Sequence, residues 1–116
     1  MPPHIVSGEI VLAPEQLPAG PVTVVARVED VSRADAPSSV VGEQVQTVEL
    51  RRGSPVPFAI EVPADRIDSR RHYAVSVHVD VSGSGEVTKG DLLTTQSYPV
   101  VTFGYPSRVQ VHVHRI

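Results

Sequence analysis

Residues 67–81 read IDSRRHYAVSVHVDV, and this stretch decides the fold class. From Tyr73 to Val81, tyrosine and valine alternate with alanine, serine, histidine and aspartate without an exception. A period of two places the two sets of side chains on opposite faces of an extended chain. The stretch therefore predicts a β-strand that turns its tyrosine and valines towards a core.

The same alternation recurs in PVTVVARVED (21–30) and SRVQVHVHRI (107–116). Valine is the commonest residue and favours strands, while eleven prolines and eight glycines predict frequent turns. Five shorter segments also fit strands: residues 5–12, 40–50 (one or two strands, with a possible bulge at Gly42), PFAIEV (57–62), DLLTT (91–95) and SYPVV (97–101). No long helix is expected, and PADRIDSRR holds at most a turn.

Seven to eight short strands over this length are typical of a sandwich or small barrel. Tyr73 favours the sandwich, because it opens the strongest strand six residues after Ile67, as in a tyrosine corner. The alternative is a tyrosine that only packs at the start of a strand. We predict an all-β, antiparallel β-sandwich, immunoglobulin/transthyretin-like in general architecture, with residues 1–116 forming a single domain.

The amino-acid composition argues against several classes of function. The formal net charge is −3 with one lysine, which argues against nucleic-acid binding. The chain has no cysteine, so disulfides, thiolate metal sites, cysteine catalysis and an acylated lipobox cysteine are excluded for these residues. No signal peptide or apolar span is visible, so we expect no membrane insertion. Localisation stays open between the cytoplasm and, if a leader was removed, the cell envelope.

Three histidines form the candidate metal site. His112 and His114 are an H-x-H pair on one strand, so both imidazoles project from one face about 6 to 7 Å apart. Such a pair can bind zinc, copper or nickel, with His78 (or His72) as a third ligand if the strand order allows. The alternative is the polar face of an exposed strand, and we expect no obligatory cofactor.

DVSRADAP (30–37) offers Asp30, Ser32 and Asp35 as oxygen ligands for calcium. The spacing does not match a helix–loop–helix calcium loop, and Asp30 is explained as well by a strand end. We therefore interpret the segment as a structural turn, closed by Pro37.

The residues offer no catalytic motif. SGSGE lacks the G-x-S-x-G pattern of a serine nucleophile, although Ser82, Ser84 and Ser97 are present. Four further carboxylates lie next to turns or on a polar face and so form no evident pair: Asp65, Asp68, Asp80 and Asp91. We expect no enzymatic activity.

Five arginines flank two of the turns: Arg51, Arg52, Arg66, Arg70 and Arg71. They would form a basic patch if both turns lay at one end of the fold. Otherwise they belong to solvated loops, and Arg70 or Arg71 could pair with the carboxylates of DVSRADAP.

Several phrases occur together in an order that resembles a known family. They are VSGEI, VEDVSRADAP, PVPFAIEVP, IDSRRHYAVSV and LLTTQSYPVVT, which span about residues 6–102. The chain thus resembles the lipoprotein chaperones of type III secretion (pilotin-like, also called YbaY-like). That resemblance implies a small β-sandwich, usually envelope-associated, that binds other proteins rather than catalysing.

The leading hypothesis is therefore a non-enzymatic, chaperone-like module that binds a protein partner. An exposed sheet edge can accept a strand from another chain, and PFAIEV and SYPVV are the candidate edges, with Pro99 suited to an edge. A homodimer through such an edge is possible. The alternatives are a histidine-mediated metal-binding protein and, less favoured because aromatics are few, a small-molecule carrier.

Overall fold

The computed structural model describes residues 2–12, 17–33 and 36–116, which form strands and one short helix. The strands are β1 (His4–Leu12), β2 (Pro21–Asp30), β3 (Ser39–Glu49), β4 (Val56–Val62), β5 (Tyr73–Asp80), β6 (Leu92–Thr94), β7 (Pro99–Val100) and β8 (Arg108–Arg115). A 3₁₀ helix, η1, covers Ala64–Arg66. No helix in the described ranges is long and apolar enough to cross a membrane.

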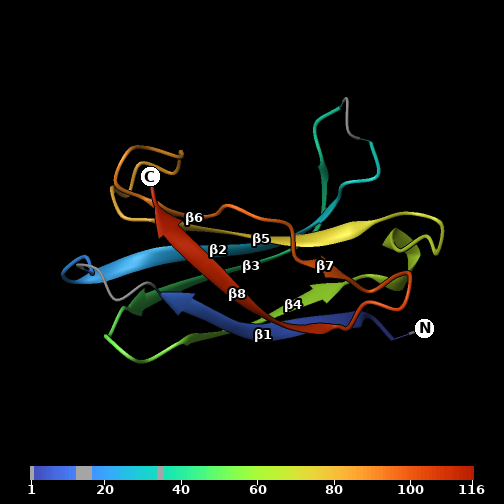
Figure 1. Ribbon diagram of the computed structural model, residues 1–116, viewed down its shortest axis with the longest axis horizontal. Coiled ribbons are helices and arrows are strands. Elements are labelled where there is room, and N and C mark those ends of the chain that lie inside the picture. Colours follow the sequence, from blue (N-terminus) through green and yellow to red (C-terminus); the bar gives the residue numbers. More distant parts are fainter. Residues whose placement is uncertain (1, 13–16, 34–35) are drawn as a thin grey trace.

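One curled sheet contains these strands in the order β3-β2-β5-β6-β8-β1-β4, and β7 pairs with β5 (Figure 1). The prediction of an all-β fold with about eight strands is confirmed. The sheet is not purely antiparallel, however, because β1 and β8 pair in parallel from Ser7–Arg108 to Leu12–Val113. The strand β8 crosses from β1 to β6 and curls the sheet towards a barrel, so the structure supports the all-β class but not a clear antiparallel sandwich.

The alternating strands bury the faces that the sequence predicts. In β2, valine or alanine at 22, 24, 26 and 28 is buried, and the residues between them are half-buried. In β4, Phe58, Ile60 and Val62 are buried while their neighbours are exposed. Tyr73, Val75, Val77 and Val79 of β5 complete this core. Removing such side chains from water is the main stabilising contribution to the fold.

The expected bulge lies in β3. Val28 of β2 pairs with Gly42, but the next residue, Glu29, pairs with Val40, so one residue of β3 is unpaired in the ladder. A Cβ at Gly42 would lie 2.8 Å from the carbonyl oxygen of Glu61 on β4. The bulge and the glycine together let β3 approach β4.

Tyr73 forms the predicted tyrosine corner. Its hydroxyl accepts a hydrogen bond from the Asp68 backbone N–H at 2.8 Å and donates one to the Arg66 carbonyl at 3.2 Å. The ring is buried, with 2% of its surface exposed. The corner therefore ties the end of η1 to the start of β5.

The two terminal strands of the sheet, β3 and β4, face each other across a seam. Two side chains of β3 bridge it: the Gln46 amide donates to the Pro57 carbonyl at 3.0 Å, and the Ala59 N–H donates to the Gln44 side-chain oxygen at 2.9 Å. Side-chain amides thus occupy the backbone groups that would otherwise form an open edge.

Candidate functional site

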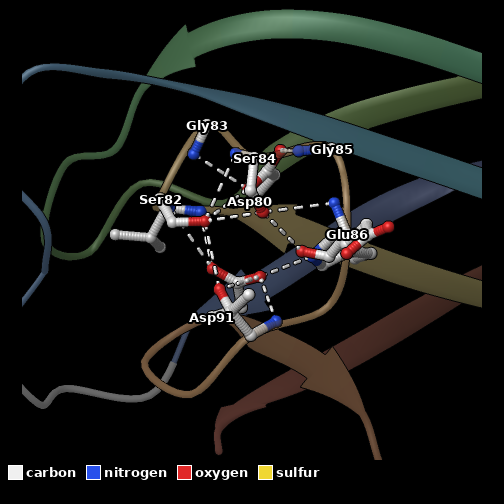
Figure 2. Close-up of polar contacts among 10 residues, drawn as sticks. Asp80, Ser82, Gly83, Ser84, Gly85, Glu86 and Asp91 are labelled. Atoms are coloured by element: carbon white, nitrogen blue, oxygen red, sulfur yellow. Dashed lines mark hydrogen bonds and ion pairs between the residues drawn. The ribbon is translucent and has the colours of Figure 1, made fainter.

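The loop between β5 and β6 folds over two carboxylates, Asp80 and Asp91 (Figure 2). Asp91 accepts hydrogen bonds from the backbone N–H groups of Val81 and Thr88, and contacts the His78 ring nitrogen Nε2 at 2.8 Å. Asp80 accepts hydrogen bonds from the N–H groups of Gly83 and Gly85. Two aspartates at the mouth of the loop thereby hold its backbone.

The electrostatics of Asp91 fit this anchoring role. Its side chain is completely buried, and burial raises the pKa of a carboxyl group. The hydrogen bonds from His78, Thr88, Val81 and Ser82 outweigh that effect and lower the pKa of Asp91 to about 2. Asp91 is therefore a carboxylate that its neighbours hold in the charged form.

His78, Asp80 and Asp91 are also the group of potential metal ligands in the described ranges whose ligand atoms lie within 4.8 Å of one another. Their oxygens, however, already accept N–H and hydroxyl hydrogens from the loop. A cation would have to displace donors that point at the same oxygens. The arrangement is best explained as a structural anchor for the loop.

The three predicted histidine ligands are not brought together. His112 and His114 are exposed on β8, as expected for alternating positions. His78 lies two strands away, since it pairs with Leu93 of β6, which in turn pairs with His114. Leu93 therefore lies between His78 and His114. Of the three histidines, only His78 contacts Asp91 and belongs to the group of potential ligands described above. Metal binding by His112 and His114 stays a prediction.

The described part of DVSRADAP is a strand end, as interpreted. Asp30 accepts a hydrogen bond from the Ser32 N–H at 3.0 Å and forms an ion pair with Arg71 at 3.0 Å. The Ser32 hydroxyl accepts a further bond from the His72 N–H at 2.8 Å. Asp35 lies outside the described residues. The described residues of the segment thereby tie the end of β2 to Arg71 and His72, just before β5.

The arginines are divided between two regions. The turn between β3 and β4, with Arg51 and Arg52, lies at the left of Figure 1, and η1 lies at the right. Near η1, hydrogen bonds from Arg70 lower the pKa of Asp68 to about 2. Arg71 pairs with Asp30, as one interpretation of the sequence expected. The five residues therefore do not form one basic patch.

The two predicted edges differ in their surroundings. PFAIEV is the terminal strand β4, but Gln44 and Gln46 occupy its free side. SYPVV contains β7, which pairs with the start of β5. Beside it, the Tyr98 hydroxyl accepts a hydrogen bond from the His112 N–H of β8 at 2.9 Å. Strand addition at either place would displace these side chains.

A feature that the sequence reasoning missed is the turn VTFGYP, residues 101–106, hereafter the aromatic turn. Phe103 and Tyr105 are 56% and 45% exposed. The Phe103 ring stacks on His72 with 4.2 Å between centroids. The signal was available, since two of the five phenylalanine, tyrosine and tryptophan residues stand two positions apart on either side of a glycine.

The aromatic turn is built tightly. The Tyr105 N–H donates to the Thr102 carbonyl at 3.1 Å, and the Thr102 N–H donates to the Val100 carbonyl at 2.9 Å. The buried Thr102 hydroxyl also donates to the Arg71 carbonyl at 2.6 Å. Val101 and Phe103 have φ of 75° and 56°, a region that is strained for side chains of this kind. Strain of this sort persists only where the surroundings impose it, and it concentrates at functional sites.

Comparison with solved structures supports the fold. The structure is similar to that of an alternative pilotin from the type II secretion system of Vibrio cholerae, with a TM-score of 0.81 and 22% sequence identity. The similarity covers 98% of this chain and 97% of the pilotin chain. None of the curated proteins matches this chain.

Comparison with family models decides the family. The model of the type III secretion system lipoprotein chaperones (YscW) matches residues 1–113, nearly the whole of the 116-residue chain. The resemblance noted in the ordered phrases of the sequence is thereby confirmed. The chain belongs to the YscW family of type III secretion system lipoprotein chaperones and is a chaperone-like protein-interaction module.

Proposed function

We propose that this chain is a non-enzymatic chaperone that holds its protein partner with the aromatic turn. The observation that carries the proposal is the exposure of Phe103 and Tyr105 on a backbone that hydrogen bonds and neighbouring residues fix in place. Large side chains that stay in water on a fixed support have their apolar surface available for a partner.

The physical advantage of this arrangement lies in the binding free energy. Tyrosine and other large aromatic side chains dominate many interfaces, because they bury much surface with few rotatable bonds. A support that is ordered before binding loses little conformational entropy on association. The positive φ values of Val101 and Phe103 are the conformational cost of presenting both rings in this way.

The absence of catalysis is part of the proposal. The family is described as chaperones, which supports it. The local contacts agree, since the Ser82 hydroxyl donates to Asp80 and the Ser84 hydroxyl to the Glu86 carbonyl, while His78 contacts Asp91. These serines and this histidine form bonds that hold the loop.

The same comparisons support a class of partner. The family is named for type III secretion and the structural neighbour for type II secretion, which supports a component of a bacterial secretion system as the partner. A homodimer through an edge of β4 would have to displace Gln44 and Gln46, and it stays a prediction.

A capture experiment tests the proposal. Tagged wild type and the double variant Phe103→Ser, Tyr105→Ser would be expressed in the native bacterium, cross-linked and purified. We expect both to fold alike, because the two side chains lie outside the core, and recovery of the secretion-system partner to fall about tenfold or more in the variant.

The matched control is the double variant Val45→Ser, Val87→Ser, which removes two equally exposed apolar side chains elsewhere, at 58% and 55% exposure. It should recover the partner as the wild type does. Equal recovery by the aromatic-turn variant, or hydrogen exchange in the captured complex that leaves residues 101–106 unprotected, would contradict the proposal.

A further inference from the structure

We infer that a groove beside η1 binds a basic residue of the partner together with an apolar neighbour of that residue. The inference rests on the proposed function, that the chain holds a protein partner. It adds a second contact surface, the groove, and the type of partner residue that this surface binds. The groove has a volume of about 630 Å³ and is lined by Pro3, Glu61, Pro63, Ala64 and Asp65.

The sequence forms this groove where β1 begins and β4 ends, at the end of the molecule where Figure 1 marks the N-terminus. Ile5 of β1 pairs with Glu61 of β4, so both side chains lie on the same face of the sheet. Pro63 then leads the chain into η1, which turns it back along the sheet and places Asp65 beside the end of β4.

The floor of the groove suits an apolar side chain. Pro3, Pro63 and Ala64 contribute apolar surface, and Ile5, which is 46% exposed, lies beside Glu61. The volume falls within the range of sites that hold small ligands, which corresponds to a few side chains. A hydrophobic or aromatic residue of the partner would therefore find contacts there.

The charge of the groove determines which kind of side chain can bind beside the apolar residue of the partner. Glu61 and Asp65 are both exposed, and neither takes part in the ion pairs of the described residues. Asp30 and Asp68 nearby are instead paired with Arg71 and Arg70. Arg66, the residue after Asp65, directs its guanidinium to the Val40 carbonyl at 3.1 Å.

Two carboxylates beside an apolar floor are complementary to lysine or arginine, whose aliphatic stem can lie on apolar surface while the charged end reaches a carboxylate. An acidic segment would be repelled. The chain itself carries a net charge of −3, so its long-range field also favours a basic partner.

The test uses a phage-displayed library of random peptides as the probe. Selection is run on the wild type and, in parallel, on the double variant Glu61→Gln, Asp65→Asn. We expect wild-type selection to enrich peptides in which lysine or arginine stands next to an apolar residue. A synthetic enriched peptide should bind the double variant about three- to tenfold more weakly, and the difference should shrink at high salt.

The matched control is Glu49→Gln, Glu86→Gln, which removes the same charge from two other exposed positions and should bind the peptide as the wild type does. Enriched peptides without basic residues, or equal binding to the groove variant, would overturn the inference. Peptides that lose binding only with Phe103→Ser, Tyr105→Ser would overturn it while supporting the aromatic turn. The two proposals can thus fail separately.

Discussion

At the scale of single residues, Tyr73 has the clearest role. Its hydroxyl bonds the last carbonyl of η1 and a backbone N–H of the segment that follows, and its ring lies in the core. The position was predictable from sequence, because an aromatic residue that opens an alternating strand after a polar connection is a local pattern. The phenol of Tyr98 also bonds backbone, at His112, but that contact joins residues far apart in sequence and no local pattern indicates it.

The variant Tyr73→Phe removes the hydroxyl and keeps the ring. The Asp68 N–H and the Arg66 carbonyl then lose a partner in a half-buried place, so we expect the free energy of unfolding to fall by about 1 to 3 kcal/mol. Urea titration followed by circular dichroism measures the change. Tyr105→Phe, at an exposed tyrosine, is the control and should change it little; equal effects of both would show that the corner is not what stabilises the fold.

At the scale of elements, the loop between β5 and β6 depends on the charge of Asp91. The sequence placed this carboxylate next to a turn. It could not show that five polar groups contact the carboxylate, because they come from β5 and from both ends of the folded loop. The strands themselves, in contrast, were predicted well from the sequence. Their alternation is local, whereas their pairing partners are chosen by the whole fold.

The pH dependence of stability tests this anchor. The folded pKa of Asp91, about 2, lies below the 3.8 of an unperturbed aspartate, so the carboxylate stabilises the fold above pH 3.8 and the contribution is lost as pH falls towards 2. Compared with Asp91→Asn, the wild type should be more stable by about 2 kcal/mol near neutral pH, and the difference should shrink in acid. Unfolding titrations of both proteins from neutral pH to about pH 2 measure it; a difference independent of pH would refute the role.

At the scale of the molecule, the seam between β3 and β4 completes the curl of the sheet. The double variant Gln44→Ala, Gln46→Ala should leave the Ala59 N–H and the Pro57 carbonyl open to water. We expect faster hydrogen exchange at the Ala59 amide, by about five- to tenfold for one lost bond. Gln110→Ala, an exposed glutamine of β8, is the control; unchanged exchange at Ala59 would mean that packing alone closes the seam.

The sequence predicted the strands, the bulge at Gly42 and the tyrosine corner, because each has a signature within a few residues. It could not predict the parallel pairing of β1 with β8, the amide-bridged seam or the division of the histidines by Leu93, because these depend on strand order. The same limit affected one of the two proposed surfaces. The groove combines residues from the start of β1, the end of β4 and η1, whereas the aromatic turn had a local signal, two aromatic residues around a glycine.

The parallel pair of β1 and β8 also governs when the fold can form. These strands pair over Ser7–Leu12 and Arg108–Val113, about a hundred residues apart, so β1 lacks this neighbour until the ribosome has made β8. Folds dominated by such distant pairings acquire their structure slowly, since a long loop must close before its contacts are gained. A chain of this kind leaves the ribosome with β1 still able to pair elsewhere, and its sheet is completed only after synthesis has passed residue 113.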